Sequence, residues 1–287
     1  MHIFVTGAAG QLGAVIVRRC REAGWRVSAA TREEVDITRH EAVMEAAARL
    51  RPDVIANCAA FNDVDGAEDR AETALAVNAF AVRSLARAAG EHGATLVHYG
   101  TDFVFDGQTS RPYTELDRPR PQSVYASAKF LGDHFAQDAE AHYVLRVESL
   151  FGGPAARSSI DRIVSSLRHG RETRVFVDRT VSPSYVEDVA EATLTLLSRR
   201  APYGLYHCVN SGQTTWHELA RELARVTGTD ESLLVPVRVA DVSLKARRPV
   251  FAALDNRKLA SVGVVMPTWQ DAVSRYCRVL DRPRSHA

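Results

Sequence analysis

The sequence predicts an α/β protein, with a doubly wound parallel sheet followed by a smaller C-terminal region. Short apolar runs alternate with helical patterns through the first half of the chain, which is typical of βαβ units. A glycine-rich segment, GAAGQLG at residues 7–13, separates the first apolar run from the first helical pattern. After Gly152 the alternation becomes irregular, so we expect one domain over residues 1–150 and a second over 151–287. Part of 180–215 is expected to complete the first domain.

The individual elements follow from hydrophobic spacing and from the residues that end each run. Residues 2–7 form a short apolar strand, and residues 14–24 form an amphipathic helix that closes at Gly24. By the same reasoning, further strands are expected at 25–31, 52–60, 94–101 and 142–152, and further helices at 40–50, 72–93 and 123–139.

The C-terminal region carries one strong helix signal. After an expected loop at 152–159, the pattern stays weak until residues 214–228. There Thr215 and Glu218 have the spacing of a capping box, and Gly228 follows the last apolar position. These residues predict a well-capped helix in the second domain.

Composition narrows the classes of function. The chain has 36 Lys and Arg against 35 Asp and Glu, which gives a net charge of +1. We therefore expect no strong electrostatic attraction to nucleic acid or to an anionic membrane. No apolar run has the length of a membrane span, and a strand-like run begins at residue 2, so we expect neither a membrane anchor nor a signal peptide. The four cysteines lack CxxC spacing, which indicates a reducing, cytoplasmic compartment. The ten histidines lack ligand spacing, so we assign no metal.

The glycine segment predicts a dinucleotide site in a Rossmann-like domain. It lies between the first strand and the first helix, where positions without side chains let backbone N–H groups approach a pyrophosphate. The helix N-terminus adds a favourable dipole. We therefore expect the cofactor to contact Gly7, Gly10, Gln11, Leu12 and Gly13.

The end of the second strand bears on the choice of cofactor. An acidic residue there would accept hydrogen bonds from the ribose hydroxyls of NAD. Thr31 and Arg32 occupy this position instead, and Glu33 and Glu34 only follow it. Because a guanidinium suits a 2′-phosphate, Thr31 and Arg32 favour NADPH, with NADH as an alternative.

Three residues predict carbonyl chemistry. Tyr125 and Lys129 lie four residues apart in a predicted helix and so share one face, although the chain has only three lysines. A tyrosine hydroxyl has an unperturbed pKa of about 10, and a nearby ammonium is expected to lower that pKa and ease proton transfer. Thr101, at the end of the fourth strand, would hydrogen-bond a substrate carbonyl. Tyr125 would then donate the proton that accompanies a hydride.

The GxxGxxG spacing and the later YxxxK pair resemble the extended branch of the short-chain dehydrogenase/reductase family. The resemblance implies that Lys129 also holds the nicotinamide ribose, and that Asn78 in the long helix relays protons to Lys129. It also implies cofactor contacts at Asp36, Ile37, Cys58, Ala59 and Ala60.

A narrower resemblance covers most of the chain. Residues 51–68, 100–129 and 248–269 look like the family of dTDP-4-dehydrorhamnose reductases and related nucleotide-sugar 4-ketoreductases, and the TDFVFDG block is specific. Residues 182–190 and 206–220 match the same family. The resemblance implies NAD(P)H-dependent reduction of the 4-keto group of a nucleotide-linked, dTDP-type 4-keto-6-deoxyhexose. It also implies that the C-terminal region binds this substrate, together with Asp102 and Phe103.

Two departures from the family leave the sugar open. Phe103 stands where the family has tyrosine, and RVESLFG at 146–152 replaces a block of the type Arg-Thr-Ser-Trp-x-Tyr-Gly. Ser149 thus replaces a tryptophan near the sugar, whereas Glu148 is expected to face away from the cleft. A precursor of rhamnose and a precursor of another deoxysugar both fit.

Two other functions remain open at this point. A nucleotide-sugar epimerase or dehydratase shares the scaffold, but a dehydratase adds acidic residues beside the threonine. Asp102 has no neighbouring glutamate, since Phe103 follows it. A non-catalytic protein resembling the regulatory subunit of methionine adenosyltransferase is the second alternative. The sequence does not decide whether the chain forms a homo-oligomer.

Overall fold

The computed structural model describes residues 1–154 and 158–280. Residues 155–157, in the loop expected at 152–159, and residues 281–287, at the end of the expected second domain, lie outside the described part of the chain. Within that part, no helix is long and apolar enough to cross a membrane.

The centre of the molecule is a six-stranded sheet in which every pairing is parallel. Its strand order is β10-β5-β4-β3-β1-β2, which confirms the predicted doubly wound parallel sheet. After β2 the chain returns past β1 to β3, so the strand order reverses between β1 and β3, and this is where open α/β sheets bind ligands. The strands are β1 (His2–Thr6), β2 (Arg26–Ala30), β3 (Val54–Asn57), β4 (Thr95–Thr101), β5 (His142–Val147) and β10 (Gly204–His207).

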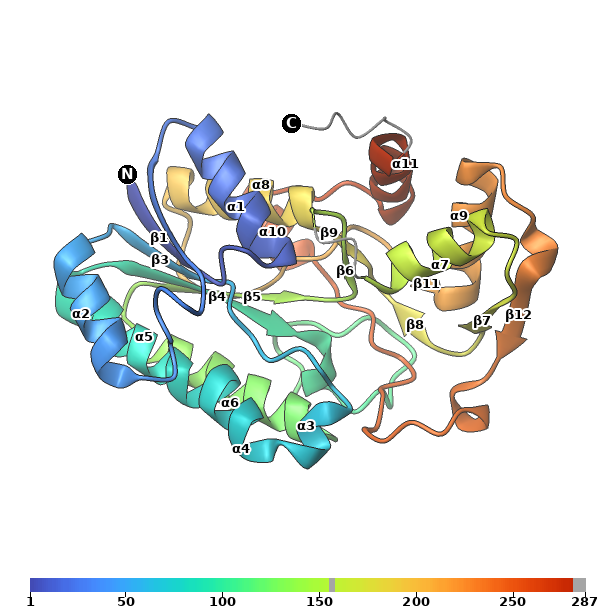
Figure 1. Cartoon of the computed structure of the whole chain (residues 1–287), viewed down its shortest axis with the longest axis horizontal. Coiled ribbons are helices and arrows are strands. Elements are labelled where there is room, and N and C mark those ends of the chain that lie inside the picture. Colours follow the sequence, from blue (N-terminus) through green and yellow to red (C-terminus); the bar gives the residue numbers. More distant parts are fainter. Residues whose placement is uncertain (155–157, 281–287) are drawn as a thin grey trace.

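Helices cover both faces of the sheet (Figure 1). On β1, Ile3 and Val5 belong to one apolar core with the helices of the upper face, whereas Phe4 belongs to the core on the other face. This alternation is the two-residue period of a strand that is buried on both sides. Helices α1 (Gln11–Glu22) and α8 (Val186–Arg199) pack on the first face, and α2 (His40–Leu50), α5 (Ala81–His92) and α6 (Val124–Gln137) pack on the second.

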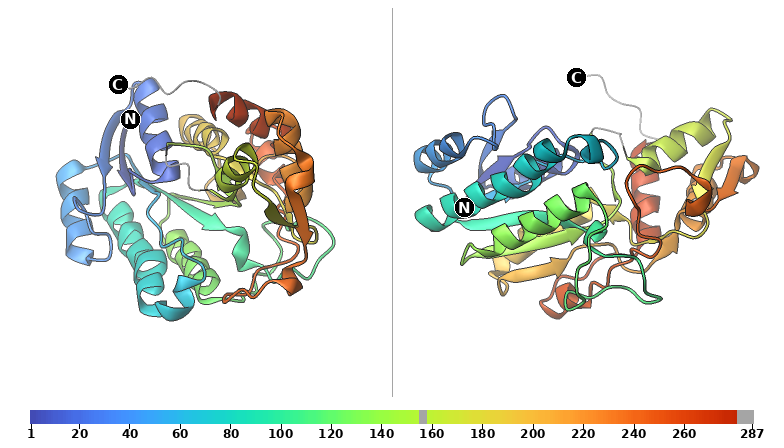
Figure 2. Two further views of the ribbon diagram at one scale, coloured as in Figure 1. Left: turned by 45° about the vertical axis from the view of Figure 1, so that its right-hand side comes forward. Right: turned by 90° about the horizontal axis from the view of Figure 1, so that it is seen from below.

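The C-terminal elements gather at one end of the sheet (Figure 2). The helix predicted around Thr215 is present, because the Thr215 hydroxyl accepts from Glu218 N and Glu218 caps Thr215 N in return. This helix ends at Gly228, which has φ +65°. These elements are β6 (Leu150–Phe151), α7 (Ser159–Arg168), β7 (Thr173–Phe176), β8 (Thr180–Val181), β9 (Ser184–Tyr185), β11 (Thr214–Thr215), α9 (Trp216–Thr227), β12 (Leu234–Val237) and α11 (Trp269–Leu280). Helix α10 (Arg257–Ser261) packs instead against β10.

Two predicted elements are interrupted. The helix predicted over 72–93 contains a π-helical turn at Ala76–Phe80, between α4 (Ala71–Leu75) and α5. The strand predicted over 142–152 stops at Val147, because Ser149 has a left-handed φ of +46° that turns the chain before β6. Both interruptions lie beside the site described below, as π turns and unusual backbone angles often do.

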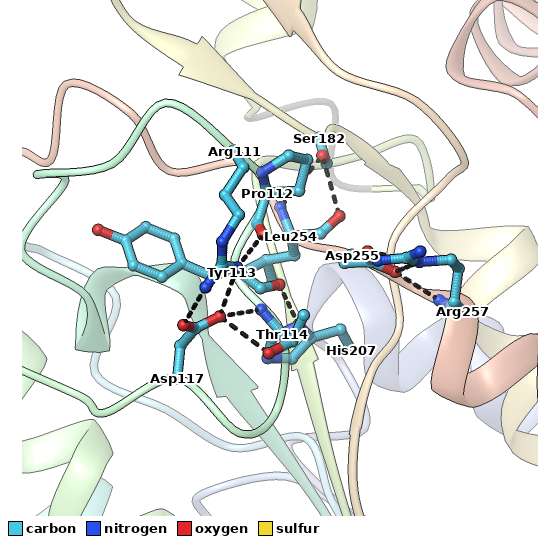
Figure 3. Close-up of polar contacts among 10 residues, drawn as sticks. All are labelled: Arg111, Pro112, Tyr113, Thr114, Asp117, Ser182, His207, Leu254, Asp255 and Arg257. Carbon is cyan, nitrogen blue, oxygen red and sulfur yellow. Dashed lines mark hydrogen bonds and ion pairs between the residues drawn. The ribbon is translucent and has the colours of Figure 1, made fainter.

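The loop that follows β4 is fastened to the C-terminal region (Figure 3). Arg111 and Asp117 pair within the loop at 2.7 Å, and the Tyr113 carbonyl lies 3.0 Å from His207 Nδ1. The Tyr113 backbone also bonds the segment around Leu254 in both directions. The loop and the C-terminal segment are therefore held together next to the carboxyl end of β4.

Candidate active site

A cavity of about 750 Å³ opens at the carboxyl ends of the central strands. Its lining comes from the turn after β1, the segment after β2, the loop after β3, the ends of β4 and β5, and the start of α6. This is the position at which an open α/β sheet takes its ligand. The volume lies within the range of small-molecule sites, about 300 to 1,000 Å³.

The glycine turn forms the floor of one end of the cavity. Gly7 has φ +64°, and a Cβ at this position would lie 2.6 Å from Ala59 N, so the turn fits against the loop after β3 only without a side chain. A Cβ on Gly13 would overlap the Gly7 carbonyl. Gly7, Gly10, Gln11 and Leu12 line the cavity, whereas Gly13 lies behind them and lets α1 start close to the turn.

The outer end of the cavity is lined by Thr31, Arg32, Glu33, Asp36 and Ile37. The Asp36 carboxylate accepts from the backbone N and the hydroxyl of Thr38, at 3.0 and 2.7 Å, and these bonds lower the pKa of Asp36. The Glu34 carboxylate accepts from Thr31 N at 2.7 Å and is therefore engaged. Arg32 is an exposed cation at the cavity edge.

The loop after β3 also lines the cavity, with Cys58, Ala59 and Ala60. Asn78, in the π turn, lies behind this loop and not in the lining. Asn78 Oδ1 accepts from Phe61 N at 2.8 Å, and Asn78 Nδ2 donates to the Phe61 carbonyl at 3.0 Å. Both polar atoms thus hold the loop, and the relay role of Asn78 stays a prediction.

Thr101, Tyr125 and Lys129 come together on the wall of the cavity. Thr101 ends β4, and α6 packs beside this strand. Helix α6 begins after Ser123, whose Oγ accepts a hydrogen bond from Ala126 N at 3.2 Å. The Tyr125 ring is buried and meets the ring of Phe103 edge-on, with centroids 5.6 Å apart.

The titration of the Tyr125–Lys129 pair differs from the prediction. We expected Lys129 to lower the pKa of Tyr125, but burial and the Asp102 charge raise it, and the Thr101 hydroxyl offsets this only in part. Lys129 Nζ donates instead to the Tyr99 carbonyl at 2.6 Å. Burial lowers the pKa of Lys129 to about 8. Tyr125 is consequently protonated at neutral pH, as a proton donor must be.

A pair of buried carboxyl groups lies next to Thr101, and only one member was predicted. Asp102 lines the cavity and accepts from Thr101 Oγ1 at 3.0 Å. Glu148 is buried at the end of β5, where its Oε2 accepts from Ser182 N at 2.6 Å. Burial raises the pKa of Asp102 to about 6, and burial together with the Asp102 charge raises that of Glu148.

The expectation that Asp102 has no acidic partner was therefore wrong. The partner comes from another strand, and adjacency in the sequence could not reveal it. Glu148 is not part of the cavity lining, as we expected, yet the charge of Asp102 acts on it and raises its pKa. A glutamate inside the apolar run at 142–152 was the signal available in the sequence.

Two arginines beside Phe103 were also missed. The guanidinium carbons of Arg179 and Arg248 lie 5.3 and 5.6 Å from the centroid of the Phe103 ring. Arg179 is buried and donates from Nε to the Pro249 carbonyl at 3.3 Å. The Phe103 ring is therefore flanked by two positively charged side chains. The sequence around Phe103 did not predict this.

The parallel sheet, the glycine turn and the Tyr125–Lys129 pair at one cavity define a class, the dinucleotide-binding proteins of the extended short-chain dehydrogenase/reductase type. Comparison with known proteins then supplies the family. The chain belongs to the RmlD substrate binding domain family, whose model matches residues 1–282. It is 36% identical over 283 residues to a dTDP-4-dehydrorhamnose reductase from Mycobacterium tuberculosis, covering 95% of this chain and 91% of the relative.

Solved structures agree with this assignment. A dTDP-4-dehydrorhamnose reductase from Clostridium acetobutylicum is similar with a TM-score of 0.94 and 30% identity, over 98% of this chain and 100% of that chain. One from Bacillus anthracis, in complex with NADP, has a TM-score of 0.92 and 27% identity, over 97% and 99%. The predicted fold and the predicted family are confirmed. The epimerase, dehydratase and regulatory-subunit alternatives gain no support from these relatives.

Proposed function

We propose that the protein reduces the 4-keto group of a nucleotide-linked 4-keto-6-deoxyhexose, with dTDP as the nucleotide and NADPH as the reductant. The observation that carries the proposal is one cavity that joins the glycine turn to Thr101, Tyr125 and Lys129. The named reductases among the relatives support the substrate class. The solved complex of a relative with NADP supports the cofactor.

The residues present fit a dinucleotide. The turn at Gly7 leaves no room for a Cβ, so backbone N–H groups and the start of α1 face the cavity, where a pyrophosphate would lie. Asp36, Ile37 and the loop after β3 would hold the adenine side. Arg32 would pair with a 2′-phosphate, which is why we propose NADPH with NADH as the weaker substitute. When bound, the cofactor supplies the hydride.

The protein supplies the proton and the positions of the reacting groups. Thr101 Oγ1 donates to Asp102 at 3.0 Å, which holds the hydroxyl at the cavity wall, and this proton would turn to the substrate oxygen when the substrate binds. Tyr125, protonated because its pKa is raised, donates a proton to that oxygen as negative charge develops on it. Lys129 holds the ribose beside Tyr125. The three side chains are buried, so each keeps little contact with solvent outside the cavity.

The sugar end of the cavity supports an altered sugar choice. Phe103 and Ser149 both line the cavity, one as an apolar ring and one as a small hydroxyl. A site that lacks a hydrogen bond to a sugar oxygen cannot strongly favour the sugar that needs it. We propose that residues 151–287 form the substrate domain over this end. Asp102 and Phe103 would contact the sugar from the sheet side.

The proposed reaction is tested by following the loss of NAD(P)H absorbance with a panel of 4-keto-6-deoxy nucleotide sugars. Stoichiometric cofactor oxidation distinguishes a reductase from an epimerase, which regenerates its cofactor, and from a regulatory subunit, which turns nothing over. Comparison of kcat/KM between dTDP-4-keto-L-rhamnose and its epimers tests the sugar choice. A preference of about a hundredfold or more for the rhamnose precursor contradicts a relaxed choice of sugar.

We also propose that the enzyme works in the cytoplasm, where nucleotide sugars are made.

A further inference from the structure

A line of buried polar groups crosses the sheet beneath Lys129. Thr6 Oγ1 donates to Asn57 Oδ1 at 2.8 Å, and Asn57 Nδ2 lies 3.2 Å from His98 Nδ1. Because the Asn57 oxygen is occupied by Thr6, the Asn57 amide donates and His98 Nδ1 accepts. The proton of the neutral imidazole is therefore on Nε2. The line links β1, β3 and β4 just before each strand reaches the cavity.

The line ends at a buried carboxylate on α6. His98 Nε2 is 3.7 Å from Asp133 Oδ1, and Arg146 Nε of β5 donates to Asp133 Oδ2 at 2.9 Å. All three residues are at most 2% exposed. A Cβ on Gly100 would lie 2.7 Å from Asp133 Oδ1, so the carboxylate presses against the backbone of β4. The groups around it come from two strands, β4 and β5, and Asp133 itself belongs to α6.

Asp133 lies one helical turn after Lys129 and thus on the same face of α6. Its charge raises the pKa of Lys129 against the larger lowering effect of burial. His98 does not compete for the carboxylate as a cation, because burial and the Lys129 charge hold the pKa of His98 well below its usual value. Asp133 thus shares its negative charge between Arg146 and Lys129.

Other charged or titratable groups near Lys129 act elsewhere. Asp102, from the turn after β4, faces Tyr125, and Tyr99 of β4 offers Lys129 its backbone carbonyl. Glu68 of α3 (Gly66–Asp69) accepts from Val124 N at the start of α6. The π turn presents no charged side chain, and the charges of α4 and α5 are on exposed residues, which include Glu72 and Arg83. Asp133 is thus the carboxylate whose charge bears on Lys129.

We propose that Asp133 is a positioning residue whose buried carboxylate keeps Lys129 in its charged form at the cavity wall, with Arg146 holding that carboxylate by a hydrogen bond and His98 lying beside it. The catalytic meaning of this assignment rests on the proposed function, since Lys129 matters to turnover only if it serves the reduction. The electrostatic assignment does not. Because the pKa of Lys129 is about 8, loss of the Asp133 charge would leave much of Lys129 neutral at physiological pH.

The test reads Lys129 directly. The chain has three lysines, and Lys245 and Lys258 are exposed, so ¹³C-labelled lysine gives three resolvable NMR titrations in the whole protein without substrate. Lys129→Arg assigns the buried signal. We expect Asp133→Asn to lower the pKa of Lys129 by about one or more, the size of effect that a nearby opposite charge produces. We expect Arg146→Gln to raise it, because a competing cation is removed and the amide still donates to Asp133.

A purely structural role for Asp133 predicts no such pair of opposite changes. Asp138→Asn, at the exposed end of α6, is the matched control and should leave the pKa of Lys129 unchanged. If Asp133→Asn fails to fold because Arg146 is left unpaired, the Arg146→Gln titration decides, and an unchanged or lower pKa of Lys129 overturns the proposal. An unchanged pKa in folded Asp133→Asn overturns it equally.

The pH profile of kcat/KM connects the pair to the reaction. In Asp133→Asn the alkaline limb should move to lower pH together with the NMR titration. If the protein turns over no keto sugar, the proposed function fails while the NMR result still stands. If turnover is normal and Lys129 titrates identically in every variant, the proposed function stands and the Asp133 assignment fails.

Discussion

Replacing Tyr125 with phenylalanine removes one hydroxyl from the cavity and leaves the packing around it in place. The ring is buried and meets Phe103 edge-on at 5.6 Å, a contact that phenylalanine keeps. The hydroxyl interacts with Thr101, and Thr101 retains its 3.0 Å bond to Asp102. We therefore expect the free energy of unfolding to change by no more than about 1 kcal/mol, the net value of one hydrogen bond.

The effect on turnover should be far larger than the effect on stability. General acid catalysis contributes about 10² to 10⁴ in rate, which corresponds to about 2.7 to 5.4 kcal/mol of activation free energy at about 1.36 kcal/mol per tenfold. Because the pKa of Tyr125 is raised, the hydroxyl is protonated throughout the neutral range, and the loss should be nearly independent of pH there.

The assay is steady-state oxidation of NADPH at a saturating concentration of a 4-keto nucleotide sugar, with cofactor affinity measured separately by titration. We expect kcat to fall and the Kd for NADPH to stay within about threefold, since binding to the rest of the cavity is unchanged. Tyr113→Phe is the matched control, because its hydroxyl bonds Asp106 and Gly107 outside the cavity lining. A kcat for Tyr125→Phe within tenfold of wild type would show that Tyr125 is not the proton donor.

Three further predictions concern Arg32 at the cavity edge, Gly13 in the glycine turn and the buried carboxyl group of Glu148. Arg32→Ala should weaken NADPH by about tenfold while leaving NADH nearly unchanged, because a charge-assisted phosphate contact is lost; equal weakening of both cofactors in binding titrations contradicts the 2′-phosphate assignment. Gly13→Ala should abolish binding of either cofactor, since its Cβ would overlap the Gly7 carbonyl, and retained binding by titration would show that the turn can shift. The pKa of Glu148 is raised above its usual 4.5, so the folded state holds a proton that the unfolded state releases, and stability is lost as pH rises above that value. Glu148→Gln cannot ionise, and its Tm should therefore rise relative to wild type as the pH is raised above 4.5 in thermal melts, whereas a constant difference would mean that Glu148 is ionised throughout.

Local patterns were sufficient for the elements that pack by regular spacing. Short apolar runs predicted five of the six strands of the sheet, all except β10, and the Thr215 capping box predicted the start of α9. The glycines at 7–13 predicted the turn because steric freedom is a property of the residue itself. The interruptions at Asn78 and Ser149 were not predictable, since their backbone angles depend on neighbours from distant segments. A Cβ on Gly132 of α6, for example, would overlap the Asn78 carbonyl.

The predicted site residues Thr101, Tyr125 and Lys129 do meet at one cavity, and their roles remain predictions for the experiments above. The sequence missed residues whose importance arises from burial. In the sequence, nothing distinguishes Glu148 and Arg179 from other charged residues. In the structure, both are buried and interact electrostatically with Asp102. No pattern of spacing identifies which charges a fold will bury together.

By itself, the sequence determined five strands of the parallel sheet, the glycine turn, the family and the residues that carry the proposed chemistry. Each of these depends on residue type at short range or on resemblance over the whole chain. Only the tertiary structure decided the pKa values of the ionisable groups in the site. The pKa of Tyr125 moves upward rather than downward because burial and the charge of Asp102 outweigh the help expected from Lys129. The pKa of Lys129 is lowered by burial and raised by the charge of Asp133, and Arg146 holds Asp133 in place by a hydrogen bond. Solvation and Coulomb interactions depend on distances in space, and those distances exist only once the chain has folded.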